Sequence, residues 1–196
     1  TEDKILMSKI TYIVYHGTDC ISAKKIMQTN FIYKRRSNHW LGNGIYFFED
    51  YKQAKWWSEI ISKKQKLLAA IIEVKLEVES DKILDLRETS AMLMFLDRAN
   101  RILEGISKND KEPISTDKHK LMCIVCDYYK IEYNIDLIIK NFSKDYKSSF
   151  LNLDTTKKNV MQLLGLNYQE VQYCVSSNQI IKNKKIIYED GDDMYV

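Results

Sequence analysis

Residues 16–18, His16-Gly17-Thr18, combine groups that can hold a polar ligand. They follow a β-branched and aromatic run at residues 10–15, which predicts a strand. A histidine and a glycine at the end of a strand place an imidazole beside exposed backbone N–H and C=O groups. That backbone pair can bind a carboxamide through both its C=O and its NH₂. The triplet therefore indicates a site that binds an amide.

A second stretch, NHWLGNGIYFFED at residues 38–50, places two of the six glycines directly before a run of aromatics. Glycine adopts positive φ, and its missing Cβ lets another group approach the backbone. Gly42 and Gly44 can therefore form a flat surface that contacts a ligand ring. Tyr46 can stack on that ring, which stabilises binding by about 0.5–1.5 kcal/mol beyond the effect of burial. The alternative is a glycine turn that leads into a core strand.

Taken together, these stretches resemble the NAD-binding core of the ADP-ribosyltransferases, in the branch of the poly(ADP-ribose) polymerases and diphtheria-type toxins. The resemblance is carried by His16-Gly17-Thr18, by GNGIYF at residues 42–47, and by a helix with Ala54 and Trp56. In that family HG[ST] and GxGIYF motifs form the nicotinamide pocket. The resemblance is strong over residues 12–58 and weaker at 81–86 and 168–176. HG[ST] alone is a weak signal, but its pairing with GxGIYF about 25 residues later is fairly specific.

The resemblance implies a role for each matching residue. Backbone groups of Gly17 would bond the nicotinamide carboxamide, and His16 would bond the adenosine-side ribose. Tyr46 and Trp56 would stack on the nicotinamide from two sides. Gln53 falls near a small hydroxyl residue of the family, so an amide contact from it is not expected. The implied NAD-binding residues are His16, Gly17, Thr18, Gly42, Gly44, Tyr46 and Trp56.

One departure from the family concerns catalysis. The family's catalytic glutamate opens a late strand, and the matching residue here is Gln172. Glu170 precedes it by two positions, so both side chains point to the same side of a strand. The implied catalytic residues are His16, Tyr46, Gln172 and Glu170, although Glu170 as a solvated strand residue is the alternative.

Cleavage of the nicotinamide–ribose bond develops positive charge on the ribose, as in glycoside hydrolysis. Preorganised electrostatic groups are commonly worth about 2.7–4 kcal/mol each. Gln172 can accept from a ribose hydroxyl but carries no charge, so Glu170 would supply the charge or act as general base. Family members with a substituted glutamate transfer single units, which favours mono-ADP-ribosylation.

The predicted fold class is α+β, because strands come first and last with helices between them. The resemblance implies a split antiparallel β-sheet core with an NAD cleft, in one domain over 1–196 with a mainly helical insertion at 89–165. Helices are predicted at 20–28, capped by Thr18 or Asp19; at 51–66, capped by Asp50; and at 89–105, 117–143 and 154–164. Strands are predicted at 10–15, 31–33, 68–78 and 168–175, with an edge strand or turn at 81–88 and a last strand pair at 180–190.

Several side chains outside the motifs also carry expectations. Trp40 is expected in the core or the cleft wall, with stacking on the substrate as the alternative, and His39 can reach the acceptor. Trp57 is expected in packing of its helix on the sheet, and His119 in solvent. The hydrophobic run at residues 92–96 is expected in the core, or else as a surface for an inhibitory partner.

Composition narrows the class of protein. Mean hydropathy is −0.38 and no apolar run approaches 18 residues, so no membrane span is expected. The first 17 residues lack the order of a signal peptide, which predicts a cytoplasmic protein. Cys123 and Cys126 form a CxxC without a second pair or nearby histidines, so we expect free thiols and no metal.

The sequence thus predicts a mono-ADP-ribosyltransferase with NAD as co-substrate, of the bacterial toxin or phage-defence type, with an antitoxin or inhibitory partner. Residues 1–75 hold 13 Lys and Arg against 7 Asp and Glu, including Lys34-Arg35-Arg36, which slightly favours nucleic acid over protein as the acceptor. The alternatives are a non-catalytic NAD or ADP-ribose module, an NAD glycohydrolase and an RNA 2′-phosphotransferase. The last would need a cluster of arginines, and only 5 of the 30 basic residues are Arg.

Overall fold

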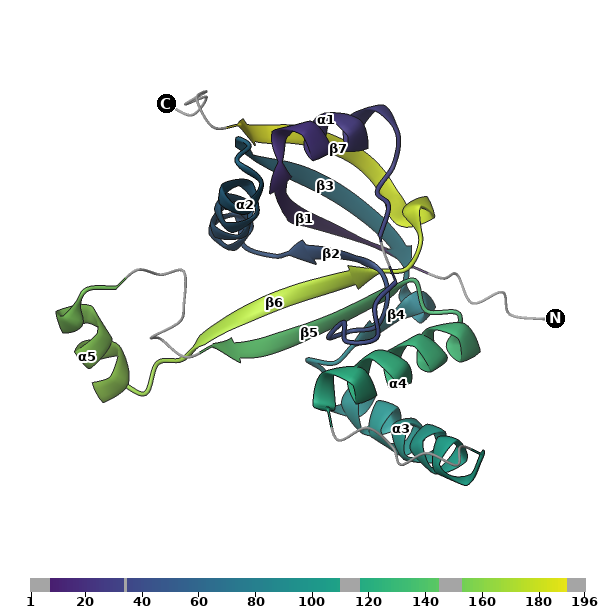
Figure 1. The fold of residues 1–196 in the computed structure, drawn as a ribbon. Coiled ribbons are helices and arrows are strands. Elements are labelled where there is room, and N and C mark those ends of the chain that lie inside the picture. Colours follow the sequence, from purple (N-terminus) through teal and green to yellow (C-terminus); the bar gives the residue numbers. More distant parts are fainter. Residues whose placement is uncertain (1–7, 34, 110–116, 145–152, 190–196) are drawn as a thin grey trace.

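The computed structural model describes residues 8–33, 35–109, 117–144 and 153–189. In this part of the chain seven strands form one sheet, mostly antiparallel, with five α-helices around it (Figure 1). The α+β class predicted from the sequence is confirmed. Lys34 and the acidic tail at 190–196 lie outside the described residues.

The sheet has the strand order β4-β5-β6-β2-β1-β3-β7. Only β4 and β5 pair in parallel. The strands are β1 (Lys9–Asp19), β2 (Ile45–Phe48), β3 (Ala69–Glu79), β4 (Ile83–Asp85), β5 (Leu137–Lys144), β6 (Tyr168–Val175) and β7 (Ile181–Glu189).

The sheet is divided where β1 meets β2. These two strands share a single paired position, Tyr15 with Phe48. By contrast, β1 pairs with β3 along its whole length, and β2 pairs with β6 at every residue. Beyond Tyr15 the two halves, β1-β3-β7 and β4-β5-β6-β2, diverge and leave one edge of β1 open.

The helices begin where the sequence places capping residues. Asp19 accepts from the Ser22 N–H at 2.8 Å, and Asp50 accepts from the Lys52 N–H at 2.7 Å. These caps fix the helices that follow the two motif strands. The helices are α1 (Cys20–Gln28), α2 (Tyr51–Gln65), α3 (Thr89–Asn109), α4 (Lys118–Tyr133) and α5 (Thr155–Leu163), with 3₁₀ turns at Ser80–Lys82 and Asn178–Ile180.

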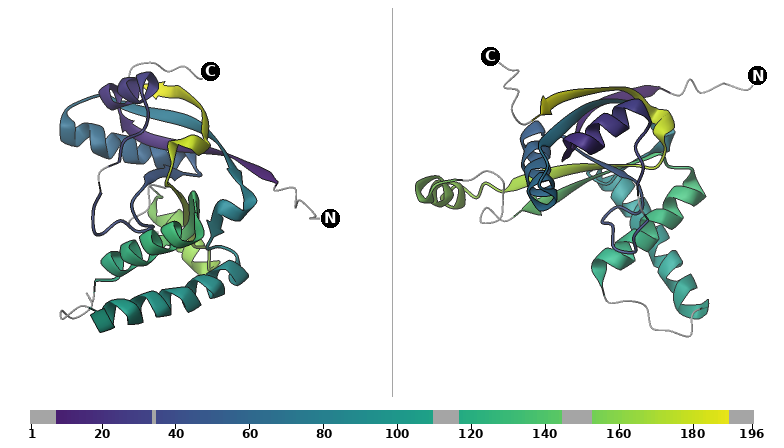
Figure 2. Two further views of the ribbon diagram at one scale, coloured as in Figure 1. Left: turned by 90° about the vertical axis from the view of Figure 1, so that its right-hand side faces the viewer. Right: turned by 45° about the horizontal axis from the view of Figure 1, so that its top comes forward.

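Two hydrophobic cores lie on opposite faces of the β4-β5-β6-β2 half. One core joins this half to β1, β3 and α1, through residues such as Phe47, Ile139 and Val74. The other joins it to α3 and α4, through residues such as Ile138 and Cys126. The alternation of Ile138 and Ile139 between the cores follows the period of two along a strand. Figure 2 shows α3 and α4 on the side of the molecule away from α1.

The prediction of one helix over 117–143 is wrong in its second half. The helix α4 ends at Asn134, which caps it in the left-handed conformation with φ 53°. The chain then forms β5, a strand that pairs with β4 on one side and β6 on the other. The proposed insertion at 89–165 therefore contributes a strand to the sheet as well as helices.

Two further strand predictions are wrong. Residues 31–33 form no strand: they pair with none of the described strands, although Phe31 is buried and Ile32 is 80% exposed. Residues 180–190 do not form a strand pair; the described part contains the single strand β7, which pairs with β3. The remaining predicted elements are found within a few residues of their expected bounds, with the 81–88 segment as the edge strand β4.

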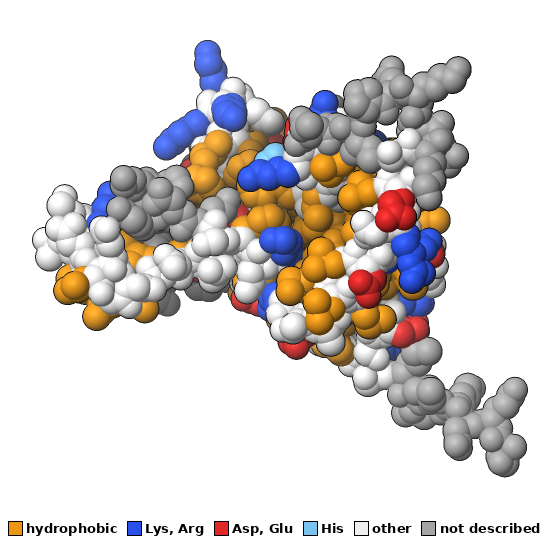
Figure 3. Space-filling view, turned by 90° about the horizontal axis from the view of Figure 1, so that it is seen from below, with side chains coloured by type: hydrophobic (Ala, Val, Ile, Leu, Met, Phe, Trp, Pro, Cys, Tyr) orange, Lys and Arg blue, Asp and Glu red, His pale blue; other side chains and the backbone are white. Residues whose placement is uncertain are grey.

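The hydrophobic run at 92–96 is largely on the surface. Phe95 is buried, whereas Met92, Leu93, Met94 and Leu96 are 40–66% exposed. Figure 3, which views the molecule from below, shows hydrophobic side chains gathered over α3. The core prediction is thus wrong for four of these residues, and their role as a partner surface stays a prediction. Within the described residues, no helix combines the length and apolar character needed to cross a membrane.

Candidate functional site

A cleft of about 420 Å³ lies where the two halves of the sheet diverge. Its walls come from β1, from α2, from β2 and β6, and from the loop before β2. The lining residues include six predicted from the sequence, which are His16, Gly17, Tyr46, Trp56, Glu170 and Gln172. The structure thus brings together segments more than 150 residues apart in the chain.

His16 bridges the open edge between β1 and β2. Its Nδ1 lies 2.8 Å from the backbone oxygen of Tyr46. A carbonyl only accepts, so Nδ1 carries the proton and Nε2 is left as an acceptor. The ring also packs edge-on against Phe31 and Phe47. Burial lowers the pKa of His16 and so favours the neutral ring. The hydrogen bond to Tyr46 acts in the opposite direction but has the smaller effect.

The Tyr46 side chain is fixed by the glycine loop. Its hydroxyl donates to the Gly42 carbonyl at 2.8 Å and accepts from the Leu41 N–H at 2.8 Å. Burial raises the pKa of this phenol, so it remains protonated at neutral pH. Tyr46 therefore lines the cleft with a ring that these two hydrogen bonds hold in place.

Gly17 serves both the cleft and the packing of α2. A Cβ on Gly17 would lie 2.1 Å from the Ala54 carbonyl oxygen, so only glycine allows α2 to approach β1 this closely. The Cys20 N–H donates to Leu68 O, beside β3. Because backbone groups alternate along an antiparallel strand, the N–H and C=O of Gly17 then point away from β3, towards the open edge.

Glu170 is the buried charged group of the cleft, with only 2% of its surface exposed. Its two carboxylate oxygens accept hydrogen bonds from the amides of Gln53 and Gln172. The Tyr168 hydroxyl donates to Gln53 Oε1 at 2.9 Å and so orients that amide. The alternative of a solvated Glu170 is therefore wrong. Because Gln172 directs its NH₂ to Glu170, its own carbonyl oxygen remains as an acceptor.

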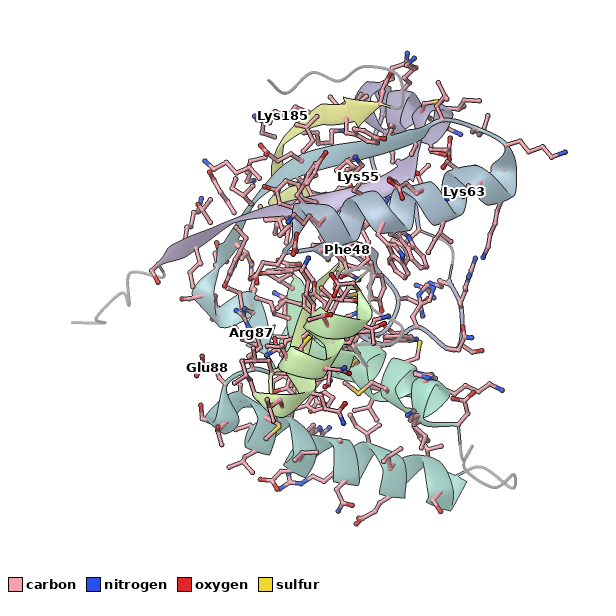
Figure 4. All side chains as sticks on the ribbon, turned by 90° about the vertical axis from the view of Figure 1, so that its left-hand side faces the viewer. Phe48, Lys55, Lys63, Arg87, Glu88 and Lys185 are labelled. Carbon is pink, nitrogen blue, oxygen red and sulfur yellow. The ribbon has the colours of Figure 1, made fainter. Side chains whose placement is uncertain are left out.

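Aromatic rings form the outer wall of the cleft. Trp56 and Trp57 come from α2, with ring centroids 6.3 Å apart. Phe48 lies beside α2 (Figure 4), and its ring is 6.5 Å from that of Trp57. Trp57 lies against Phe48 of β2, as expected for a residue that packs α2 onto the sheet, but it is also 42% exposed and lines the cleft.

Three predicted binding residues do not line the cleft. Thr18 is buried, and Gly44 lies against Cys174 and Val175. Gly42 has φ +78°, and a Cβ there would approach Asp127 and Lys130 of α4. These residues shape the loop behind Tyr46 and do not form a floor for a ligand, because the glycines face α4 and β6.

The glycine loop is anchored to α4 through Asn43. Asp127 accepts from the Asn43 backbone N–H at 2.7 Å and from its side-chain amide at 2.6 Å. Lys130, only 7% exposed, donates to the Asn43 carbonyl at 2.9 Å and lies 3.5 Å from Asp127. A helix of the insertion therefore holds the loop that positions Tyr46.

Sequence reasoning missed the contact of Gln53 with Glu170 and the position of Asn38 in the cleft wall. Gln53 had been assigned no contact, and its bond to Glu170 depends on a strand 117 residues away in the chain. Arg36, Asn38 and His39 line the cleft together with Trp40, which confirms Trp40 as a wall residue. His119 stacks on Trp40, with centroids 5.2 Å apart, so it is half-buried and only partly solvated. The available signal was the group of basic and aromatic residues at positions 34–40.

Comparison with known proteins gives a partial relative. No protein-family model matches the chain. An uncharacterized protein of Methanocaldococcus jannaschii, MJ0359, is 38% identical over 94 residues. That match covers 46% of this chain and 44% of the relative, so the chain spans less than half the length of the curated relative that it matches. The name of that protein states no activity.

Proposed function

We propose that the protein is an NAD-dependent mono-ADP-ribosyltransferase that modifies a macromolecule. The observation that carries this proposal is the cleft itself. Its lining combines a neutral imidazole, glycine backbone groups directed to the free edge of β1, a tyrosine ring held by two hydrogen bonds and a buried carboxylate. These are the groups needed to hold a carboxamide-bearing ring and to stabilise positive charge beside it.

The fold supports the same proposal. We assign the divided sheet to the ADP-ribosyltransferase type, with the cleft at the division between the halves. In this assignment Gly17 binds the nicotinamide carboxamide, and Tyr46 and Trp56 contact the ring. His16 Nε2 accepts from a ribose hydroxyl.

The reaction needs little covalent chemistry from the protein. The bond from ribose C1′ to the nicotinamide nitrogen breaks, and its electron pair neutralises the pyridinium. A nucleophile of the acceptor forms the new bond to C1′ and loses its proton to Glu170 or to water. The Glu170 carboxylate stabilises the positive charge that develops on the ribose.

The pair of Glu170 and Gln172 favours single transfer. Gln172 offers its carbonyl oxygen to a ribose hydroxyl and adds no charge. Its NH₂ holds the Glu170 carboxylate in place. The charged group is thus one pleat away from the position of the family glutamate, which supports mono-ADP-ribosylation over chain growth.

The test uses NAD labelled in the ADP-ribose part, incubated with the protein and cell extract. The products are digested separately with nuclease and with protease. We expect label on a macromolecule, released nicotinamide in equal amount, and loss of both in Glu170→Gln. A matched control is Glu77→Gln, which changes a partly exposed β3 carboxylate paired with Lys75.

Other outcomes would replace the proposal. Released nicotinamide without macromolecular label would identify an NAD glycohydrolase. Binding of NAD without turnover would identify a binding module. Absence of NAD binding by the folded protein would contradict the assignment of the cleft.

A further inference from the structure

Three rings from separate parts of the chain meet at Trp40, one of the residues that line the cleft. Trp40 stacks on His119 with centroids 5.2 Å apart and an interplanar angle of 18°. Trp40 also lies against Phe142, with centroids 5.1 Å apart. The three come from the loop before β2, the first turn of α4 and β5. Each is only partly buried, so this group, called the aromatic rim below, presents ring surface to solvent.

The aromatic rim is continuous with the cleft. Trp40 lines the cleft beside Asn38 and His39. The His39 ring in turn lies 5.6 Å from that of Tyr46. A molecule that rests on Trp40 can therefore extend into the space between Tyr46 and Glu170.

One lysine contacts the aromatic rim directly, and further basic residues adjoin it in the sequence or line the cleft with it. Lys140 Nζ lies 4.3 Å from the centre of the Phe142 ring. Arg36 lines the cleft and is exposed, as are Lys118 and Lys120 on either side of His119. The nearest carboxylate in sequence, Asp117, accepts from the His119 N–H as the cap of α4.

We propose that the aromatic rim binds an unpaired base of a single-stranded nucleic acid, and that this strand is the acceptor of the transferase. The inference rests on the proposed function and names its substrate class. Flat rings beside cations match a chain of bases and phosphates, because bases stack on aromatic side chains while lysine and arginine contact the backbone. In a duplex the base faces are covered by neighbouring pairs, so an unpaired strand fits the rim better.

Binding is measured first, without NAD, by fluorescence anisotropy of labelled single strands of about 12 nucleotides, as DNA and as RNA, with a duplex of the same sequence. We expect single strands to bind at about 50 mM salt and to weaken as salt rises. Trp40→Ala should weaken binding about tenfold, the loss expected for one stacked base. Trp40→Phe should recover most of that loss.

Tyr133→Ala is the matched control. Tyr133 is also a stacked, exposed aromatic of α4, with its ring 4.4 Å from Tyr129, but it lies outside the cleft. It should change strand binding less than twofold. Thermal melting of each variant separates loss of the platform from loss of folding.

The transfer assay with labelled NAD then separates this inference from the proposed function. Label on the single strand, reduced in Trp40→Ala, supports both. Label confined to protein overturns the strand as the acceptor while the transferase assignment stands. Equal binding by wild type and Trp40→Ala overturns the aromatic rim as a base platform, whatever the transfer assay shows. Strand binding through Trp40 without any NAD turnover keeps the platform and overturns the transferase. Preference for the duplex contradicts the unpaired base.

Discussion

The Glu170 carboxylate gives the site its charge, and its surroundings explain why that charge is held in place. It is buried on a strand, where an unpaired carboxylate would be costly, and two amides donate to it. Gln53 and Gln172 are thus positioning residues for a group that would face the reacting ribose.

Glu170→Gln removes this charge with little change in shape. We expect transfer to fall about 10²–10³-fold, while the Kd for NAD changes less than about threefold, because the charge acts mainly on the developing cation. The NH₂ of the new glutamine would then face the donating NH₂ of Gln53 or Gln172, so the free energy of unfolding should drop by about 1–3 kcal/mol. Single-turnover assays and urea unfolding measure the two effects. A transfer rate equal to that of Glu77→Gln would remove Glu170 from the mechanism.

His16 makes stability depend on pH. Burial lowers its pKa in the folded protein, whereas the unfolded chain has the ordinary value near ~6.5. Below about pH 6.5 the unfolded state therefore binds more protons, and stability should fall as pH falls towards the folded pKa. Above that window the residue contributes no pH dependence.

The expected measurement is urea unfolding at several pH values for wild type and His16→Asn. The variant should lose stability less steeply with acid than wild type does. His39, whose pKa burial also lowers, stays in the variant and accounts for a residual slope. Identical slopes in the two proteins would show that His16 titrates normally.

The contact between α2 and β1 positions two elements that line the cleft. It depends on Gly17, since the Ala54 carbonyl occupies the space of a Cβ. Gly17→Ala should therefore separate the helix from the strand and destabilise the protein by about 1–3 kcal/mol, as overpacking does. The urea concentration at the midpoint of unfolding should fall, and the Kd for NAD should rise.

Gly105→Ala is the matched control for that change. Gly105 lies within α3 with open space around it. Alanine there should stabilise the protein by about 0.5–1 kcal/mol, because glycine is unfavourable inside a helix. Equal destabilisation by both substitutions would contradict the packing role of Gly17.

The link from α4 to the glycine loop can be tested with two substitutions on one helix. Asp127→Ala leaves the Asn43 N–H without its acceptor and should cost about 1–3 kcal/mol. It should also weaken NAD binding, because the loop holds Tyr46. Glu132→Ala breaks an exposed pair with Arg98, which is worth about 0–1 kcal/mol. Unchanged NAD binding in Asp127→Ala would show that the loop is fixed by other contacts.

Local signals allowed much of this element structure to be predicted. The strand β6 was placed at its observed bounds, and Asp19 and Asp50 marked the starts of their helices. The segment that became β5 was predicted as helix because it is buried on both faces only at Leu137, Ile138 and Ile139, and so short an apolar run does not distinguish a strand from a helix. Its partners, β4 and β6, are distant in sequence, so no local pattern could reveal the pairing.

The site shows the same division. His16, Gly17 and Tyr46 were found because they lie in motifs. The contact from Gln53 to Glu170 and the stack of Trp40 on His119 join elements far apart in the chain. These contacts depend on tertiary packing, and the residue types alone gave no pairwise signal.

At the scale of the whole molecule, the cleft links two halves of the sheet that share a single paired position between β1 and β2. A ligand that contacts His16 and Gly17 of one half and Tyr46 and Gln172 of the other would add contacts that exist only in the folded state. Binding of this kind raises the melting temperature as ligand concentration rises.

We therefore expect the Tm of the protein to increase with the logarithm of NAD concentration. At an NAD concentration of about 100 times the Kd, the free energy of unfolding should be about 2.7 kcal/mol higher than without NAD. The Glu170→Gln variant is suited to this measurement, because slow turnover preserves the NAD. Nicotinamide alone should give a smaller shift, since it leaves the ribose contacts unmade. Trp56→Ala should reduce both shifts by removing one ring face from the cleft wall. If the Tm does not change with NAD concentration in a variant that melts cooperatively, the cleft binds a different ligand.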